Sequence, residues 1–391
     1  MEHYKYLIIG GGMTANAAVQ GIRSVDAAGK IGVIGAESDP PYDRPPLSKA
    51  LWKGVSVDTI WRKTDQQDVT FHLGRTVTAI EPANKQVADS QGNRYSWDKL
   101  LLATGGSPRR LPFGDDHIIY FRTLADYRRL RALTEKGQRF AVIGGGFIGS
   151  EIAAALTLNQ KKVVMIFPGK SIANRVFPND LSQFVSGFYQ QKGVEIVAGE
   201  KLSGLEKRGG QLVVKTSSSL EILVDGVVAG IGIEPNVELA QTANVKVEHG
   251  IVVDEFLRTS HPDIYAAGDV AAFHSPALAK RIRVEHEDNA NTMGRLAGRN
   301  MAGQSEPYHH LPSFYSDMFE LGYEAVGELD SRLETFADWK RPNKEGVIYY
   351  LHNGRVRGVL LWNVWGQVDA ARALIAEPGP FRAENLKGRL K

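Results

Sequence analysis

A glycine-rich turn near the start of the chain constrains the fold more than any other feature. The apolar run Tyr6-Leu7-Ile8-Ile9 leads directly into the spacing G-x-G-x-x-A, and an alanine-rich segment follows. The first glycine of such a motif permits a tight turn, the second lets a pyrophosphate approach the backbone, and a small third residue lets helix and strand pack closely. The helix N-terminus then points at the phosphates. The residues assigned to this turn are Gly10, Gly12, Met13, Thr14 and Ala15.

The residues beyond this turn favour a nucleotide site. Glu37 lies just past the next apolar strand, residues 31–34. An acid at this point of a βαβ unit accepts hydrogen bonds from a ribose. The alternative is a glycine-rich turn that only packs a helix onto a strand.

The same pattern occurs a second time. Residues 140–143 form an apolar run, a full G-x-G-x-x-G follows, and residues 152–156 continue as an apolar helix. Gly10 and Gly144 are 134 residues apart. Two fingerprints in strand–turn–helix context predict two Rossmann-like units and therefore two dinucleotides. The residues assigned to the second turn are Gly144, Gly146, Phe147, Ile148 and Gly149.

Three further segments look structured around these turns. Pro45-Pro46 suits the first turn of a helix that would carry Lys49 inward beside Leu47 and Leu51. Residues 69–102 have the pattern of short strands and end in the small residues Ala103, Thr104 and Gly105, against which a cofactor can lie. Residues 263–270 form an apolar strand that ends in Gly268 and Asp269. A helix is expected from about residue 285 to 301, with small residues at close-packing positions, and another over 368–375, ending the ordered part.

The composition excludes several classes of function. The 391 residues suffice for two or three domains, and none is cysteine, which rules out disulfides, thiolate metal sites, iron–sulfur ligation and a thiol relay. No metal site is expected. The formal charge of +3 and the lack of a long basic run argue against a nucleic-acid partner. No apolar run reaches the roughly 20 residues of a membrane span, and the first strand begins too early for a signal peptide, so we expect a cytoplasmic protein.

Several motifs together resemble one family. The chain resembles the two-dinucleotide flavoprotein reductases, and most closely the ferredoxin-reductase-like branch that contains apoptosis-inducing factor. The segments that carry this resemblance are residues 41–52, 144–151, 167–178, 284–303, 314–317 and 359–363. It implies an α/β fold with a discontinuous FAD-binding domain (1–114 and 241–305), an inserted NAD(P)-binding domain (115–240) and a C-terminal α+β domain (306–391).

The resemblance places FAD on the first fingerprint. It implies that Glu37 binds the adenosine ribose, Arg44 the pyrophosphate, and Asp269 the ribityl chain or a flavin phosphate. Relatives often place the acid one residue earlier, where this chain has Ala36. For Asp269, the alternative is a helix cap or a solvated strand end. The full set expected on the flavin side is Gly10, Gly12, Met13, Thr14, Ala15, Glu37, Arg44, Lys49, Ala103, Thr104, Gly105, Gly268, Asp269, Glu285, His286 and Tyr315.

Lys49 and Glu151 are the expected catalytic residues. The family pairs a lysine and a glutamate at these positions, near the point where hydride reaches the flavin. A charge near the flavin tunes its electronics, and a partner keeps the lysine ionised in a dry pocket. The alternatives are an exposed lysine on an amphipathic helix and a glutamate that caps one.

A nicotinamide nucleotide is expected on the second fingerprint. Phe147 either gates the nicotinamide pocket or only packs. The Glu285-His286 pair matches one that relatives place near the nicotinamide, and the alternative for His286 is a satisfied core histidine. Tyr315 stands where relatives have a tryptophan and can still stack on a ring. The set expected on the NAD(P) side is Gly144, Gly146, Phe147, Ile148, Gly149, Glu151, Lys170 and Gly232.

The segment after residue 167 bears on the choice of nicotinamide nucleotide. An acid at this position selects NAD through the 2′-hydroxyl, whereas cations select NADP through the 2′-phosphate. Apoptosis-inducing factors carry a glutamate after the Phe-Pro pair, and this chain has Gly169 followed by Lys170, with Arg175 close by. Weak discrimination follows, with NADPH oxidised within a factor of roughly 100 of NADH.

The predicted function is that of an FAD-dependent NAD(P)H oxidoreductase. Hydride passes from NAD(P)H to FAD, and electrons then reach a ferredoxin- or rubredoxin-type carrier or a quinone without cysteines. The alternative is a redox-sensing flavoprotein, similar to apoptosis-inducing factor, that forms a homodimer or binds a partner when reduced. A basic docking face for an acidic carrier, or simply a solvated surface, is suggested by Arg109, Arg110, Arg122, Arg128, Arg129 and Arg131.

Overall fold

The computed structural model describes residues 1–114 and 116–390. It divides into two compact units, each assembled from separate stretches of chain. Unit 1 contains residues 1–44, 57–107 and 234–312, and unit 2 contains residues 45–56, 108–233 and 313–391. The predicted three-domain division is finer than these two units, and it remains a prediction. Its boundary at residue 115 falls on a position outside the described residues.

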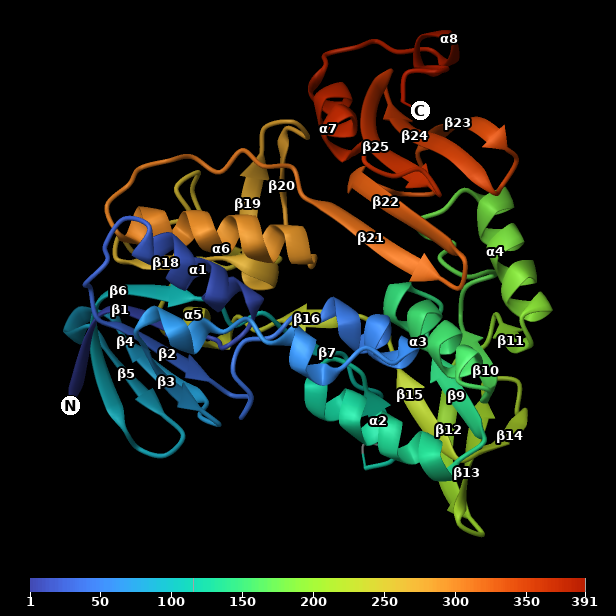
Figure 1. Ribbon diagram of the computed structural model, residues 1–391, viewed down its shortest axis with the longest axis horizontal. Coiled ribbons are helices and arrows are strands. Elements are labelled where there is room, and N and C mark those ends of the chain that lie inside the picture. The colour runs from blue at the N-terminus through green and yellow to red at the C-terminus, as the bar shows by residue number, and fades with distance from the viewer. Residues whose placement is uncertain (115, 391) are drawn as a thin grey trace. The chain divides into compact units, whose positions relative to one another are not determined.

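Unit 1 is built on a largely parallel sheet (Figure 1). The strands β3 (Val69–Leu73), β2 (Ile31–Gly35), β1 (Glu2–Ile9) and β6 (Arg94–Leu102) lie in that order and run parallel. The strand β18 (Ile264–Ala266) adds to β6 in the same direction. The same edge of β6, opposite β1, pairs antiparallel with β5 (Gln86–Asp89) at residues 94–96, and β5 pairs antiparallel with β4 (Val77–Glu81). The order 3-2-1 with the first strand in the middle is that of a mononucleotide-binding half.

Helices α1 (Met13–Arg23) and α6 (Glu287–Met301) pack against each other almost at backbone distance. A Cβ atom on Gly21 would lie 2.1 Å from the carbonyl oxygen of Arg295, and one on Gly298 would lie 2.1 Å from that of Ala18. Glycine is therefore required at both positions. The expected close packing of the small residues on the 285–301 helix is confirmed.

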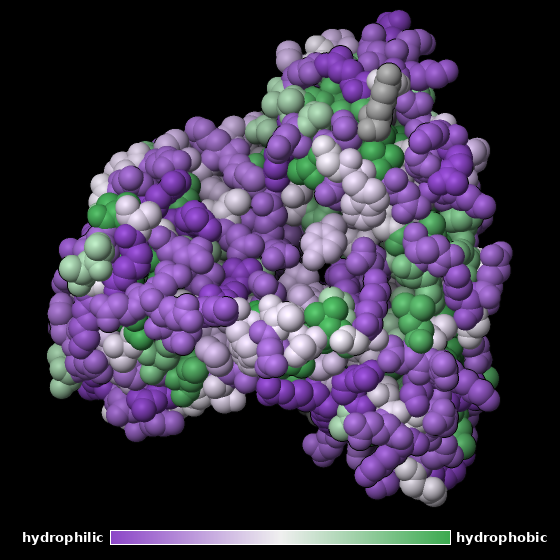
Figure 2. Space-filling view, in the orientation of Figure 1, coloured by the Kyte–Doolittle hydropathy of each residue, from purple (hydrophilic) through white to green (hydrophobic). Residues whose placement is uncertain are grey.

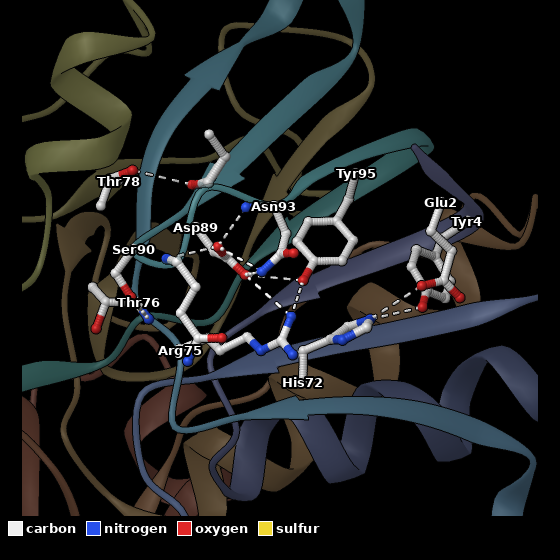
Figure 3. A network of polar contacts seen from close by, with 12 residues as sticks. Glu2, Tyr4, His72, Arg75, Thr76, Thr78, Asp89, Ser90, Asn93 and Tyr95 are labelled. Atoms are coloured by element: carbon white, nitrogen blue, oxygen red, sulfur yellow. Dashed lines mark hydrogen bonds and ion pairs between the residues drawn. The ribbon is translucent and has the colours of Figure 1, made fainter.

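A buried polar network ties the strands of unit 1 together near the start of β1 (Figure 3). Asp89 is 3% exposed and accepts hydrogen bonds from Tyr95 Oη at 2.9 Å and from Asn93 N at 2.9 Å. Arg75 donates to Tyr95 Oη at 2.6 Å, and Tyr4 Oη lies 2.8 Å from His72 Nε2. Desolvation opposes the charge of Asp89, but the bonds from Asn93 and Tyr95 lower its pKa to about 2.

Unit 2 contains a second, wholly parallel sheet of five strands in the order β11-β10-β9-β15-β8. These strands are β11 (Val194–Ala198), β10 (Lys162–Phe167), β9 (Arg139–Ile143), β15 (Gly226–Ala229) and β8 (Ile118–Tyr120). The helices of this region are α2 (Leu124–Lys136), α3 (Phe147–Leu158) and α4 (Asn179–Gln191). A capping box between Thr123 and Asp126 starts α2. The sheet therefore repeats the strand–turn–helix unit of the first one.

The last part of unit 2 is an antiparallel five-stranded sheet covered by a helix. Its strands, in spatial order, are β21 (Ser313–Met318), β22 (Leu321–Gly327), β25 (Arg355–Trp362), β24 (Glu345–His352) and β23 (Glu334–Arg341). Helix α7 (Val368–Ala376) packs on β22 and β25. The expectation that order ends with this helix is wrong, because α8 (Ala383–Leu386) follows and Leu386 and Leu390 are buried.

Shorter elements complete the chain. Unit 2 also holds an antiparallel sheet of β12 (Leu202–Arg208), β13 (Gln211–Thr216) and β14 (Glu221–Val224). Unit 1 holds α5 (Glu238–Thr242) and a sheet of β17 (Ile251–Val252), β19 (Ala271–Ser275) and β20 (Lys280–Ile282). The chain passes between units within β7 (Gly106–Pro108) and β16 (Ile233–Pro235), which pair with each other.

The segment after Pro45 differs from the expected helix. It forms two 3₁₀ turns, η1 (Pro45–Ser48) and η2 (Ala50–Lys53), and Lys49 lies between them with φ −128°. Leu47 and Leu51 are buried as expected. Other 3₁₀ turns are η3 (Val57–Ile60), η4 (Thr64–Gln67), η5 (Pro82–Asn84) and η6 (Gly268–Val270). The α/β fold class is confirmed, and within the described residues no helix is both long and apolar enough to cross a membrane.

Candidate nucleotide and redox site

The first glycine turn is shaped to admit a ligand at the N-terminus of α1. Gly10 has φ +117°, and a Cβ atom there would lie 2.1 Å from the carbonyl oxygen of Ala103. Gly12 is the N-cap of α1 and supplies no side-chain acceptor, so the first backbone N–H groups of the helix have no cap. Ala15 is 1% exposed, as the motif requires. N–H groups without a side-chain cap, at the positive end of a helix, fit a pyrophosphate.

Arg44 brings a cation to the same turn. Its Nη2 atom lies 3.9 Å from the position that a Cβ on Gly12 would take, and its backbone N–H approaches Met13 Sδ at 3.5 Å. The guanidinium pairs with Glu37, which also accepts a hydrogen bond from Tyr42 Oη at 2.5 Å. Desolvation opposes the charge of Arg44, but Tyr42 and Glu37 raise its pKa overall. The predicted ribose acid and pyrophosphate cation are therefore adjacent in unit 1.

Asp269 lies near Arg44, and His286 lies near Asp269. Gly268 precedes Asp269 with φ +79°, and a Cβ on it would lie 2.3 Å from Thr14 Oγ1, which places η6 directly against the start of α1. Arg283 donates to the Asp269 backbone oxygen at 2.9 Å and pairs with Glu285 at 2.7 Å. Desolvation lowers the pKa of His286 to about 4 although Asp269 opposes the shift, so its imidazole is neutral at pH 7.

The small residues after β6 are held by a side chain that the sequence did not reveal. Asn236 Nδ2 donates to the Thr104 oxygen at 2.8 Å, and Thr104 Oγ1 donates to the Asn236 oxygen at 2.8 Å. The backbone N–H of Asn236 donates to the Gly105 oxygen at 3.0 Å. These bonds fix residues 103–105 beside the first glycine turn, as expected of a backbone on which a cofactor lies.

The second glycine turn repeats the geometry of the first in unit 2. Gly144 has φ +113°, and a Cβ there would lie 2.4 Å from the Gly230 carbonyl oxygen. A Cβ on Gly149 would lie 2.0 Å from the Gly144 oxygen, whereas one on Gly146 would meet no atom within 4 Å. Gly146 is the N-cap of α3 and again provides no side-chain cap. An open position in front of uncapped N–H groups fits a second dinucleotide.

The other residues predicted on this side have different surroundings. Phe147 is half-buried, with its ring centroid 5.6 Å from that of Phe314 and 6.4 Å from that of Tyr323. Ile148 is exposed, and Gly232 accepts a hydrogen bond from the Arg109 backbone at 2.9 Å. Lys170 is exposed on the loop that follows β10. Phe147 therefore packs against two aromatic rings, and its gating of the nicotinamide pocket stays a prediction.

The predicted Lys49–Glu151 pair forms in unit 2. Glu151, on α3, is 3% exposed, and its Oε2 atom lies 2.7 Å from Lys49 Nζ. Ser48 Oγ donates to the same oxygen at 2.6 Å, and Ser316 Oγ donates to Oε1 at 2.6 Å. Three donors therefore hold both oxygens of one buried carboxylate. The alternatives of an exposed lysine and a capping glutamate do not describe this arrangement.

An exposed aromatic ring lies on the other side of the lysine. Tyr315 is 42% exposed, and its ring centroid is 5.3 Å from Lys49 Nζ, within the range of a cation–π contact. Lys49 is thus held between a carboxylate and a ring. Sequence reasoning missed Ser48 and Ser316, although each is next to a residue that it singled out.

The residues at both glycine turns fit a nucleotide. At each turn the helix begins without a side-chain cap, and a Cβ atom on the first glycine would collide with a backbone carbonyl oxygen. No group of three or more acidic, histidine or cysteine side chains suited to a metal ion occurs within residues 1–114 and 116–390. The fold and these two turns define a protein that carries two dinucleotide cradles and a buried lysine–carboxylate pair, which is the class of the two-nucleotide oxidoreductases.

Comparison with known proteins agrees with this class. Residues 4–294 match the family described as pyridine nucleotide-disulphide oxidoreductase, and residues 297–345 and 340–377 match the C-terminal domain of apoptosis-inducing factor. The chain belongs to the pyridine nucleotide-disulphide oxidoreductase family. The predictions of an FAD-dependent NAD(P)H oxidoreductase and of these two cofactors are confirmed.

Three relatives illustrate the match. Apoptosis-inducing factor 1, mitochondrial, from Dictyostelium discoideum is 33% identical over 96% of this chain and 79% of its own. The anthranilate 1,2-dioxygenase system ferredoxin–NAD(+) reductase component of Burkholderia cepacia is 34% identical over 95% and 94%. The structure of the covalent putidaredoxin reductase–putidaredoxin complex superimposes with a TM-score of 0.91 at 30% identity, covering 98% of this chain and 95% of that one.

Proposed function

We propose that this oxidoreductase is an NAD(P)H-dependent reductase of a small acidic iron–sulfur protein. The observation that carries the proposal is the Lys49–Glu151 pair, buried and held by two serines in the unit that also contains the second glycine turn. FAD, when bound, can accept a hydride and release electrons one at a time. The chain has no cysteine, so electrons leave without a thiol relay.

The residues divide into binding and redox roles. Arg44 would neutralise the pyrophosphate of FAD, Glu37 would accept a hydrogen bond from its ribose, and Asp269 would bind toward its flavin end. Lys49 would supply a fixed positive charge to the flavin, and such a charge would favour the acceptance of a hydride. Glu151 holds that charge in place, and Ser48 and Ser316 hold Glu151. The roles toward FAD rest on the resemblance, and the roles of Glu151, Ser48 and Ser316 rest on the contacts among these residues.

A basic surface supports an acidic partner. Arg128 and Arg129 are exposed on α2, and the Arg131 guanidinium lies 5.1 Å from the centre of the Trp52 ring. Trp52 lines an open groove of about 660 Å³ together with Lys53, Thr157, Leu158, Lys192, Phe319 and Glu320. The face drawn in Figure 2 is mostly hydrophilic, with smaller hydrophobic groups within it. Because Arg128 and Arg129 are exposed, electrostatic steering is the expected means of docking. Two similar proteins are named for a redox-protein partner: one is a ferredoxin–NAD(+) reductase component, and the other is putidaredoxin reductase in covalent complex with putidaredoxin.

Stopped-flow spectroscopy tests the proposal. The flavin absorbance is followed during reduction by NADH or NADPH, and then during reoxidation by an acidic [2Fe–2S] ferredoxin, a rubredoxin or a quinone. We expect the iron–sulfur protein to reoxidise the flavin fastest, with a rate that falls as salt increases. Reversal of charge in Arg128→Glu/Arg129→Glu should slow this step about tenfold. The control pair Lys201→Glu/Lys207→Glu reverses the same number of charges. Lys207 is exposed on β12, and Lys201 is exposed immediately before that strand. Equal rates for all acceptors, or equal effects of both pairs, would contradict the proposal.

A redox-sensing role is the second candidate. The match of residues 297–377 to the C-terminal domain of apoptosis-inducing factor favours it. In that case reduction by NAD(P)H should produce a homodimer or a complex, and reoxidation should be slow. Sedimentation of the oxidised and the NADH-reduced protein distinguishes the two roles. A cytoplasmic location and a quinone acceptor remain predictions.

A further inference from the structure

The loop that follows β10 sits where this fold chooses between its two nicotinamide nucleotides. An acid at the end of the second strand binds the 2′-hydroxyl of NAD, whereas a cation accommodates the 2′-phosphate of NADP. We propose that residues 168–175 form a 2′-phosphate subsite, so that the second nucleotide site prefers 2′-phosphorylated adenine nucleotides. The inference rests on the proposed function, because it requires a nicotinamide nucleotide at the second glycine turn.

The loop is held in place by bonds to its surroundings in unit 2. Ala173 donates its N–H to the Gly145 oxygen at 2.8 Å, which joins the loop to the glycine turn itself. Gly199 donates to the Gly169 oxygen at 3.0 Å, and the Ile172 N–H donates to Ser186 Oγ at 2.9 Å. Ile172 is completely buried. An anchored loop presents its side chains without a large ordering cost when a ligand binds.

Two cations flank the anchored part of the loop. Lys170 and Arg175 are both exposed, and neither side chain has a hydrogen-bond or ion-pair partner among the described residues. The positive charges are therefore available to an anion. A phosphate bound by charged donors forms bonds about twice as strong as neutral ones, and arginine can bind it through two donors.

No carboxylate of the loop opposes a 2′-phosphate. Residues 168–175 contain no acid, and at Gly169 a Cβ atom would lie 2.4 Å from Asn174 Oδ1. A larger residue at this position would therefore require the Asn174 side chain to move.

The acid at the neighbouring strand end is already engaged. Glu200 follows β11, and its backbone N–H donates to the Phe167 oxygen at 3.2 Å. Its carboxylate accepts hydrogen bonds from Ser217 Oγ at 2.7 Å and from the Ser218 N–H at 3.0 Å. Ser217 and Ser218 lower the pKa of Glu200 to about 2. These bonds hold the carboxylate toward the segment after β13 rather than leaving it to accept from a ribose.

Calorimetric titration of the FAD-loaded protein tests the inference without turnover. The two probes, adenosine 2′,5′-bisphosphate and adenosine 5′-monophosphate, differ only by the 2′-phosphate. At low salt the bisphosphate should bind about tenfold more tightly or better, equivalent to about 1.4 kcal/mol. Lys170→Glu should abolish this preference and leave the affinity for the monophosphate within about twofold. Arg175→Glu should reduce the preference for the bisphosphate.

Lys162→Glu is the matched control. Lys162 is an exposed lysine at the opposite end of β10, and its reversal changes net charge equally. The inference is overturned if the monophosphate binds as tightly as the bisphosphate, or if the control variant lowers the preference as much as Lys170→Glu. Binding of NADH without a preference for the bisphosphate leaves the proposed function intact. Failure of NADH, NADPH and both probes to bind would overturn the proposed function itself.

Discussion

Removal of Lys49 is the perturbation whose outcome depends most directly on the site geometry. In Lys49→Met the side chain keeps most of its length and loses its charge, so the buried Glu151 carboxylate loses the cation that lies 2.7 Å away. Breaking one partner of a buried ion pair costs about 3–5 kcal/mol, because the remaining charge is stranded. Ser48 and Ser316 still donate to the carboxylate, which places the expected loss near the lower limit, about 3 kcal/mol.

The assay is urea unfolding of the FAD-loaded protein, followed by fluorescence, at a fixed excess of free FAD so that binding contributes equally to every variant. Lys49→Met/Glu151→Gln removes both charges. A double-mutant cycle should therefore show coupling of about 2 kcal/mol between the two positions. Lys53→Met is the control, since Lys53 is exposed on the same 3₁₀ segment. In parallel, Lys49→Met should lower the flavin reduction potential and slow reduction by NADH.

The reasoning would be refuted by a loss below about 1 kcal/mol, no larger than that of Lys53→Met, or by additive effects in the cycle. A fully stable Lys49→Met variant with an unchanged flavin potential and unchanged hydride transfer would remove Lys49 from the redox site altogether.

Three further outcomes are expected. Ser316→Ala removes the donor to Glu151 Oε1 and should cost about 1.5–3 kcal/mol in urea unfolding, with Ser316→Thr retaining most of that stability. Gly144→Ala places a Cβ 2.4 Å from the Gly230 oxygen at φ +113°, so NADH binding measured by calorimetry should be lost while the protein still binds FAD, and unchanged affinity would count against the second cradle. Asp89→Asn removes a carboxylate whose pKa is lowered from 3.8 to about 2, which is worth about 2 kcal/mol at pH 7. Because a lowered folded-state pKa stabilises above the unfolded value, that stability should fade in the native protein as pH falls from about 4 to 2, and the variant should lack this slope in pH-dependent unfolding.

Short-range patterns determined the class of this protein from sequence. Each glycine motif lies between an apolar strand and a helix, and its requirements are local: a positive φ at Gly10 and Gly144, no side-chain cap at Gly12 and Gly146, and a small residue at Ala15 and Gly149. The missing cysteines likewise follow from composition. The Lys49–Glu151 pair was also predictable, but through resemblance, because no local pattern joins residues so far apart.

Only the tertiary structure decided how the charged groups are held. The donors to Glu151 come from Ser48 and Ser316, which are 103 and 165 residues away along the chain, and no periodicity signals such a contact. Three other contacts also join residues that no sequence pattern links. They are the hydrogen bonds of Asn236 with Thr104 and of Ser217 with Glu200, and the close approach of the Asn174 amide to Gly169. The physical reason is that backbone conformation depends on neighbouring residues, whereas the partner of a buried charge is whichever side chain the packed elements bring within about 3 Å.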